Sequence, residues 1–299
     1  MDRILVANRG SLTLASDSWT NQRSESVVNY VASTRQYSIF LKTEVTGSER
    51  HSGENLGRRL INCIEDLGGS EAVIALVTDN ASNMKIACSE VEKRYPELLT
   101  IGCASHIVNL TVEDILKHGT IPGAINLAVN IVRYFKGSTI LTGALNEAAA
   151  AMGEQRRTLK LPGKTRWQGK LETITSLIAN KAYIQAITEN RQLCLGSQPT
   201  AENRAKYDAI KDIVHRFSFW EKMEVLQKFL KPFLQVTIAL EGSKPKASRI
   251  YAYFRYLLFQ TILTTDLNQR EIATIITRRW GQIDRPQYTI AYMRSHSSR

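Results

Sequence analysis

The sequence predicts an α/β fold, in which a mixed sheet is followed by an all-helical region. Two observations carry this prediction. Strand-like and helical patterns alternate over the first 120 residues, whereas every apolar pattern after that has helical spacing. The first three strand-like segments follow one another directly and form a meander, while the last two are each preceded by a helix. Because a strand–helix–strand connection places its strands in parallel, we expect a three-strand meander plus two parallel strands.

The elements of the sheet region are expected in the order β-β-β-α-β-α-β-α. The strands are predicted at 10–18, 27–32, 37–45, 73–78 and 99–103, and the helices at 54–67, 81–94 and 104–117. If the fourth strand returns beside the first, both run in the same direction. Asp17 and Asp79 would then lie at the same edge, on strands about 4.8 Å apart. Open α/β sheets bind their ligands at that edge.

The remaining chain is predicted to be helical. The helices are expected at 121–135, 139–152, 168–190, 201–215, 218–240, 247–263 and 269–280. Phe219 and Trp220 begin an apolar helix and are expected in the core, and 281–299 is expected to be a frayed end or the start of further structure. We therefore expect a sheet domain over 1–135 and a basic helical domain, truncated at its C-terminus, over 136–299.

Charge is distributed unevenly along the 299 residues. The whole chain carries a formal charge of +11, yet residues 1–150 hold 14 Lys and Arg against 16 Asp and Glu, so the excess lies in 151–299. A solvated basic surface is one explanation. The size of the difference favours a polyanionic partner such as DNA.

Several classes of protein lack support in the sequence. No apolar run is long enough to span a membrane, so no membrane partner is expected. The four scattered cysteines predict reduced thiols in an intracellular protein. Neither a phosphate-binding P-loop nor a Gly-x-Ser-x-Gly elbow occurs, which argues against nucleotide or ester hydrolysis and against a small-molecule substrate.

The aspartate pair has two interpretations. Asp79 could cap the helix at 81–94 while Asp17 closes a strand, and Asp is common at helix N-caps. Alternatively, both carboxylates hold Mg²⁺ or Mn²⁺, which prefer hard oxygen ligands. Two such ions would activate a water or hydroxyl and stabilise the leaving oxygen in phosphodiester cleavage. Asn80, Ser82 and Asn83 weaken the case for Asp79 as the sole cap, because they could cap the helix too.

Two further motifs bear on function. Cys103 and His106 have the spacing of a zinc half-site, but no second pair accompanies them, so core packing is the simpler interpretation. Trp167 lies in a loop among basic residues that include Lys164, Arg166 and Lys170. Such a loop could stack the indole on an unpaired base while the cations neutralise phosphate, or the indole could anchor the loop on the core.

Five segments in this order resemble the core of hAT-family transposases. They are LASDSWTN (14–21), VTDNASNM (77–84), YPELLTIGCASHIVNL (95–110), TRW (165–167) and FW (219–220). The resemblance covers most of residues 10–240. Within the hAT family, the segments resemble more specifically an uncharacterised domain family in transposase-derived plant and fungal proteins.

The resemblance implies a ribonuclease-H-like fold and an ancestral metal-dependent DNA strand cleavage and transfer. Asp17 and Asp79 match the first two catalytic acids of the family, and Trp167 matches a tryptophan that stacks on a flipped base. The resemblance also implies a place for His106 near the acids or the DNA. We expect Cys103, Trp19 and Asn80 as structural residues beside the site.

The sequence also departs from the family. The third acid, a glutamate near a Ser-Glu-Arg motif that also serves dimerisation, has no counterpart before Arg299, and neither Glu172 nor Glu241 has the right surroundings. The usual zinc-finger domain has no room before Asp17. We therefore expect an incomplete or inactive transposase-derived nuclear protein that oligomerises only in a longer form. The alternative is a domesticated nuclear DNA-binding or protein-interaction module without catalysis.

Overall fold

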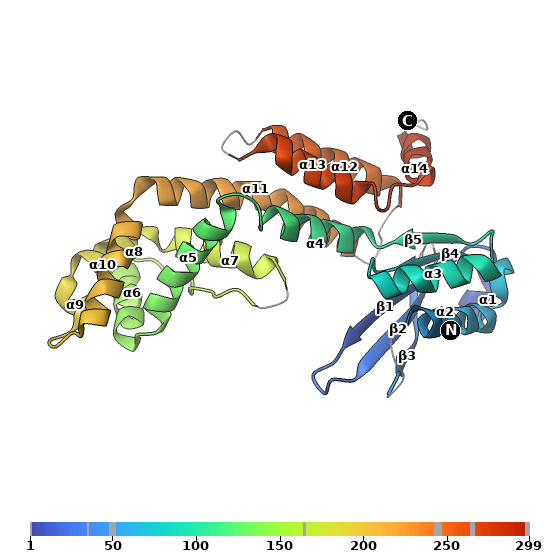
Figure 1. Cartoon of the computed structure of the whole chain (residues 1–299), viewed down its shortest axis with the longest axis horizontal. Coiled ribbons are helices and arrows are strands. Elements are labelled where there is room, and N and C mark those ends of the chain that lie inside the picture. Colours follow the sequence, from blue (N-terminus) through green and yellow to red (C-terminus); the bar gives the residue numbers. More distant parts are fainter. Residues whose placement is uncertain are drawn as a thin grey trace. The chain divides into compact units, whose positions relative to one another are not determined.

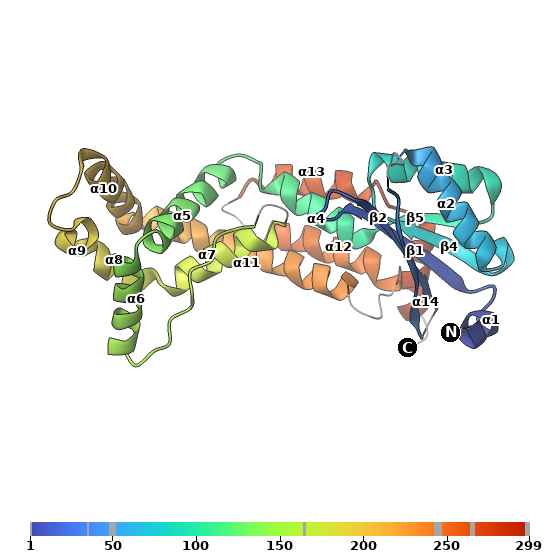
Figure 2. The ribbon, with the colours of Figure 1, turned by 90° about the horizontal axis from the view of Figure 1, so that it is seen from below.

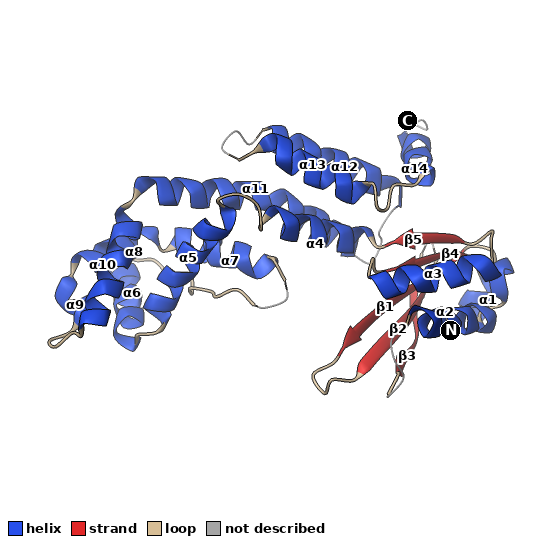
Figure 3. Cartoon of the chain, in the orientation of Figure 1, coloured by secondary structure: helices blue, strands red, loops and turns tan. Residues whose placement is uncertain are grey.

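The structure, a computed structural model, describes residues 2–34, 36–47, 52–163, 166–241, 247–263 and 267–296. The chain divides into two compact units. The first comprises residues 1–108, 238–254 and 278–299, and the second comprises 109–237 and 255–277. The first unit therefore ends its continuous part well before the boundary at 135 that the sequence suggests, and two later segments return to it. All strands of the described residues belong to this unit (Figure 3).

The sheet of the first unit is mixed and has five strands in the order β3-β2-β1-β4-β5. The strands are β1 (Leu12–Thr20), β2 (Ser26–Ser33), β3 (Ser38–Val45), β4 (Val73–Thr78) and β5 (Leu99–Gly102). Strands β1, β2 and β3 pair antiparallel as a meander, whereas β4 runs parallel to both β1 and β5. The predicted fold class and the return of β4 beside β1 are thus confirmed.

One face of the sheet packs against two helices, α2 (Gly53–Asp66) and α3 (Ser82–Arg94), which lie side by side over it (Figures 1 and 2). The strands alternate, so every second residue of β1 and β2 points into this core. Leu12, Leu14 and Tyr30 are fully buried there. On α2, Leu56, Leu60 and Ile64 recur at helical spacing and complete the core, as their sequence pattern predicts.

Other parts of the first unit are short. The chain begins with α1 (Asp2–Ala7), and a 3₁₀ turn (Gly69–Glu71) precedes β4. The first turn of α4 (Ala104–Ile115) follows β5 directly. A last helix, α14 (Pro286–His296), lies in the segment that we expected to be either a frayed end or the start of further structure. Its first residue is a proline, whose fixed φ and missing N–H suit the first turn of a helix.

The second unit is helical. Its elements are α5 (Ile121–Lys136), α6 (Thr139–Ala151), α7 (Gln168–Ala179), α8 (Lys181–Glu189), α9 (Arg191–Leu195), α10 (Ala201–His215) and parts of α4, α11 (Phe217–Glu241), α12 (Ala247–Ile262) and α13 (Gln269–Trp280). Phe219 and Trp220 are buried, as predicted. None of the described helices combines the length and the apolar character that a membrane span needs.

The helix predicted over 168–190 is wrong in one respect, because the chain forms two helices that meet at Asn180. The Asn180 amide nitrogen donates to the carbonyl of Ser176, 2.7 Å away, and to that of Arg157, also at 2.7 Å. An asparagine that bonds to backbone carbonyls competes with helix continuation. The side chain is fully buried, so this junction is part of the core of the second unit.

Candidate functional site

The site lies where the parallel part of the sheet ends. Two successive rows of residues cross β1, β4 and β5 in register, first Ala15, Val77 and Ile101, then Ser16, Thr78 and Gly102. The next residue along each strand direction is Asp17, Asp79 or Cys103. Side chains alternate between faces, so these three follow the face of Ala15, Val77 and Ile101, away from α2 and α3. The register thus brings residues from three distant segments to one edge.

Asp17 lies within β1, which continues to Thr20. We expected the strand to end on this aspartate, and the difference arises because β1 keeps pairing with β2, where Asp17 stands opposite Asn29. The Asp17 side chain is exposed to solvent. Trp19 lies two residues further on and therefore on the same face, with 41% of its surface exposed.

Asp79 shapes the turn between β4 and α3 without capping the helix. Its Oδ1 accepts the N–H of Ala81 at 2.8 Å, and this is its only side-chain hydrogen bond within the described ranges. Ala81 occupies the N-cap position and supplies no side-chain bond. The capping interpretation in its simple form is therefore wrong, since neither Asp79 nor Asn80 is the N-cap residue. The turn leaves Asp79 half-buried at the edge.

Asn80 ties β4 to the strand beside it. Its amide nitrogen donates to the carbonyl of Cys103 at 3.0 Å. A Cβ atom on Gly102 would lie 2.1 Å from the Asn80 Oδ1 atom, so glycine is required for this approach. The N–H of Cys103 in turn donates to the carbonyl of Thr78 at 2.7 Å. These bonds fix Asp79 and Cys103 as neighbours.

The charges of both carboxylates act on Cys103. Burial is the largest cause that raises the pKa of its thiol, and the negative charges of Asp17 and Asp79 raise this pKa further, while backbone N–H groups of His106 and Ser105 oppose the shift. The thiol therefore stays protonated at neutral pH and is a poor metal ligand there. Both acids lie close enough to Cys103 for their charges to matter.

The donor set suits a hard divalent cation rather than zinc. Two carboxylates on adjacent strands offer oxygen ligands, and Mg²⁺ is commonly bound by one or two carboxylates together with water and substrate phosphates. In the described part of the chain, no group of three His, Cys, Asp or Glu side chains is arranged to hold a metal. His106, half-buried in α4, has no such partners with Cys103. The residues present therefore fit one Mg²⁺ or Mn²⁺ ion better than two.

Glu241 returns to the neighbourhood of this edge. It is the last residue of α11, and its Oε1 accepts the hydroxyl of Ser105 at 2.9 Å, which joins it to the first turn of α4. The two residues are 136 positions apart. Nothing in the local sequence around Glu241 indicates this contact, because it depends on where the chain re-enters the first unit.

In the basic loop before α7, the tryptophan is buried, whereas the neighbouring cations that the structure describes are either paired or exposed. Trp167 is only 1% exposed, and its indole N–H donates to Asn109 Oδ1 at 2.8 Å. Lys170 lies 3.1 Å from Glu113, so its charge is paired, whereas Arg166 is exposed. Lys164 lies outside the described residues. The indole thus anchors its loop in the described arrangement, and stacking on a base would require the loop to open.

Taken together, a mixed five-stranded sheet with two acids at its parallel edge and a following helical region define a ribonuclease-H-like α/β core. Two family models match the chain. Residues 6–131 match a domain of unknown function, DUF659, which is a hAT-transposase-like family, and residues 101–213 match the ZBED1 RNase-like helical domain. A search of curated proteins gave no match. Both matches support a relationship of this chain to transposase-derived, hAT-like domains.

Proposed function

We propose that this protein binds DNA and retains part of an ancestral strand-cleavage site that no longer cuts. The observation that carries the proposal is that Asp17, Asp79 and Cys103 each follow the last paired row of the parallel strands β1, β4 and β5. The first two positions keep the carboxylates that metal-dependent phosphodiester chemistry needs, and the third holds a protonated thiol. The similarity to hAT-like domains supports DNA as the substrate from which this site descends.

Asp17 and Asp79 would hold one Mg²⁺ or Mn²⁺ ion, which when bound supplies charge neutralisation for a DNA phosphate. Asp79 would present the oxygen that Ala81 does not engage, and Asp17 would approach from the adjacent strand. Efficient cleavage commonly uses two ions that stabilise the attacking and leaving oxygens together. Two carboxylates are too few ligands to position both, so we infer binding without turnover.

The basic second half of the chain would supply most of the DNA affinity. Lysine and arginine neutralise phosphates, and this term is independent of sequence. Arg166 and Arg157, which flank the loop of Trp167, are exposed and have no ion pair in the described structure. A protein of this kind would act in the nucleus, either as a remnant transposase or as a domesticated DNA-binding module.

The proposal is tested with the full chain and three variants, Asp17→Asn, Asp79→Asn and the double change. Binding is measured by mobility shift on duplex DNA, and cleavage by conversion of supercoiled plasmid to open circles with Mg²⁺ or Mn²⁺. Without divalent ions we expect all four proteins to bind the duplex equally, and with Mg²⁺ or Mn²⁺ we expect none of them to nick the plasmid. Nicking by the unaltered chain that the double variant loses would show an intact nuclease and refute the loss of turnover. Absence of DNA binding would refute the proposal as a whole.

Metal binding is measured separately, through the loss of the free Mn²⁺ signal in electron paramagnetic resonance. The unaltered chain should bind Mn²⁺, and Asp79→Asn should weaken this binding strongly, because a carboxylate ligand is lost. Asp208→Asn is the matched control, since Asp208 is exposed on α10 and far along the chain from the edge. Equal Mn²⁺ binding by all three proteins would contradict an ion at Asp17 and Asp79.

A further inference from the structure

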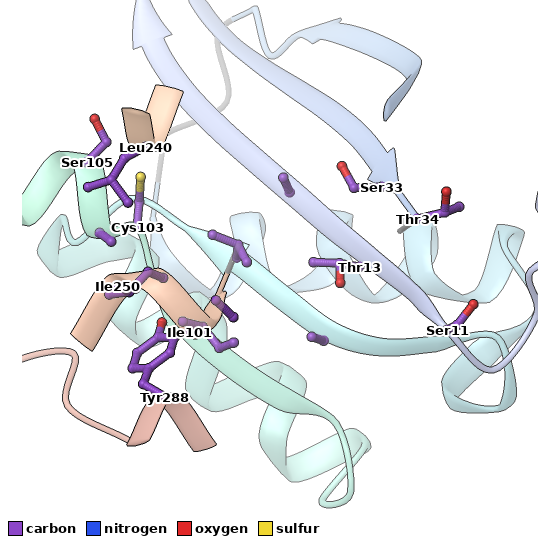
Figure 4. A pocket seen from close by; sticks show the side chains of 16 residues that line it. Ser11, Thr13, Ser33, Thr34, Ile101, Cys103, Ser105, Leu240, Ile250 and Tyr288 are labelled. Carbon is purple, nitrogen blue, oxygen red and sulfur yellow. The ribbon is translucent and has the colours of Figure 1, made fainter. Parts of the chain in front are cut away.

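A cavity of about 410 Å³ lies within the first unit, on the face of the sheet opposite α2 and α3 (Figure 4). Thr13, Val77 and Ile101 form its floor on β1, β4 and β5. Ile250 of α12 and Tyr288 of α14 lie across from this floor. Cavities of ~300–1,000 Å³ are the usual size for small-molecule sites. The lining residues that the structure describes all belong to the first unit, so the cavity is described within that unit.

The chemistry of the lining selects the class of ligand. None of the lining side chains that the structure describes carries a charge, and most of the lining surface is aliphatic. An ion placed here would lose its hydration without gaining a partner, which is costly. Hydroxyl groups add some polarity, but several already have partners, as when Ser33 pairs with Ser38 and Ser105 donates to Glu241. The lining therefore suits an uncharged, mostly apolar molecule.

Tyr288 supplies the feature that points to a ligand. It is only 2% exposed, and its hydroxyl has no hydrogen-bond partner within the described structure. Its ring packs against Trp280, with centroids 6.0 Å apart, and the hydroxyl is directed into the cavity toward Ile101 (Figure 4). Burial raises its pKa to about 12, so the group is a neutral donor at physiological pH. Buried hydroxyls without partners are rare because each costs desolvation free energy.

We propose that this cavity binds an uncharged, largely apolar small molecule whose carbonyl or ether oxygen accepts a hydrogen bond from Tyr288. The ligand accepts a hydrogen bond from the Tyr288 hydroxyl, which is the one buried polar group of the lining without a partner in the described chain. This is a binding site and not a second catalytic centre. The inference does not require DNA binding: of the sheet-edge row only Cys103 is among the described lining residues, and neither Asp17 nor Asp79 is.

The probe for the test is prodan, an uncharged aromatic ketone whose fluorescence moves to longer wavelength when its carbonyl accepts a hydrogen bond. We expect the full chain to bind prodan saturably. In Tyr288→Phe, the bound probe should emit at shorter wavelength and bind about 2- to 10-fold more weakly, the usual effect of one lost hydrogen bond. Folding should survive this change, because it removes an unsatisfied buried group and keeps the ring.

Two further variants make the test decisive. Ile250→Trp places a larger side chain on the half-buried wall of the cavity and should abolish saturable binding. Tyr37→Phe is the matched control, because Tyr37 is half exposed and outside the lining. Failure of the unaltered chain to bind prodan saturably would overturn the proposal. So would equal binding and equal emission in Tyr288→Phe, Ile250→Trp and the control.

Discussion

Cys103 is the residue through which the geometry of the aspartate pair can be measured. Its thiol lies at the third position of the row that begins with Asp17 and Asp79, and both carboxylates raise its pKa in addition to the larger effect of burial. A negative charge beside a thiol disfavours the thiolate, so the two acids act in the same direction. The ionisation of one cysteine therefore reports the proximity of two residues that are 62 positions apart in the sequence.

We predict that Asp17→Asn and Asp79→Asn each increase the rate at which Cys103 is alkylated by iodoacetamide at neutral pH. The thiolate is the reactive form, and removal of a neighbouring negative charge lowers the thiol pKa and enlarges the thiolate fraction. The pH midpoint of alkylation should move downward in both variants. It should stay above the ordinary value for cysteine, because burial, the main cause, is unchanged. Mass spectrometry of the modified peptide gives the rate for each cysteine separately.

Cys194 is the internal control for this measurement. Its pKa is also raised mainly by burial, but Lys211 and Tyr134 are its neighbours and no acid of the sheet edge contributes. Its alkylation should be the same in all three proteins. If the pH dependence of Cys103 alkylation is also the same in all three proteins, then the two carboxylates do not lie close to Cys103. That result would contradict the proposed origin of the site.

At the same scale, Trp167 marks the limit of what could be predicted for the site. The sequence supplies an aromatic residue among cations, a pattern that fits both a base-stacking loop and an anchored loop. Only the hydrogen bond between Trp167 and Asn109, 58 positions earlier, favours the interpretation in which the indole anchors the loop. Asp17 and Asp79 were predictable because strand order and direction follow from local patterns, whereas the Ser105–Glu241 contact and the Tyr288 cavity depend on segments that return late to the first unit.

At the scale of elements, the packing of α2 on α3 depends on glycine. A Cβ atom on Gly57 would lie 2.8 Å from Cβ of Glu90 and 3.3 Å from the carbonyl oxygen of Ala87 on α3. These distances are shorter than ordinary contacts, and one of the atoms belongs to the backbone. The missing side chain therefore allows the two helices to approach each other over the sheet. Glycine in a helix interior is otherwise unfavourable, so its presence here indicates a packing requirement.

We predict that Gly57→Ala lowers the stability of the protein by about 1–3 kcal/mol, the usual cost of overpacking. Gly143→Ala on α6 is the matched comparison, because a Cβ atom added at Gly143 would meet no other atom within 4 Å among the described residues. That change should stabilise by roughly 0.5–1 kcal/mol through helix propensity alone. The midpoint of urea unfolding, followed by circular dichroism, shows whether each variant is more or less stable than the unaltered chain. A stabilising effect of Gly57→Ala would contradict the close approach of α2 and α3.

Most elements were predictable from the sequence because their periodicity agrees with their environment. Helix α10 and strand β4 have the bounds that were predicted, and both carry clear apolar patterns between breakers. The failures have local causes. Asn180 divides a continuous helical pattern through its bonds to backbone carbonyls, and α14 shows little periodicity because it buries Tyr288 while neighbouring residues such as Ile290 remain exposed.

At the scale of the whole molecule, charge is segregated along the chain and the candidate DNA-binding residues follow it. The second half holds 25 of the 39 Lys and Arg residues, while the first half, which contains both aspartates of the edge, has a small acidic excess. DNA affinity that depends on released counterions falls as salt concentration rises, with a slope that counts the phosphates neutralised. The slope can therefore assign the contacts to one half of the chain.

We predict that the combined change Arg157→Gln and Arg166→Gln weakens binding to duplex DNA and reduces the slope of log affinity against log salt by about two, because each lost phosphate contact removes nearly one. Both arginines are exposed, so folding should be unaffected. The matched control removes the same charge from the first half through Arg23→Gln and Lys85→Gln, which are also exposed. Its slope should equal that of the unaltered chain. An equal loss of slope in both double variants would mean that net charge, and not a surface near the Trp167 loop, attracts the DNA.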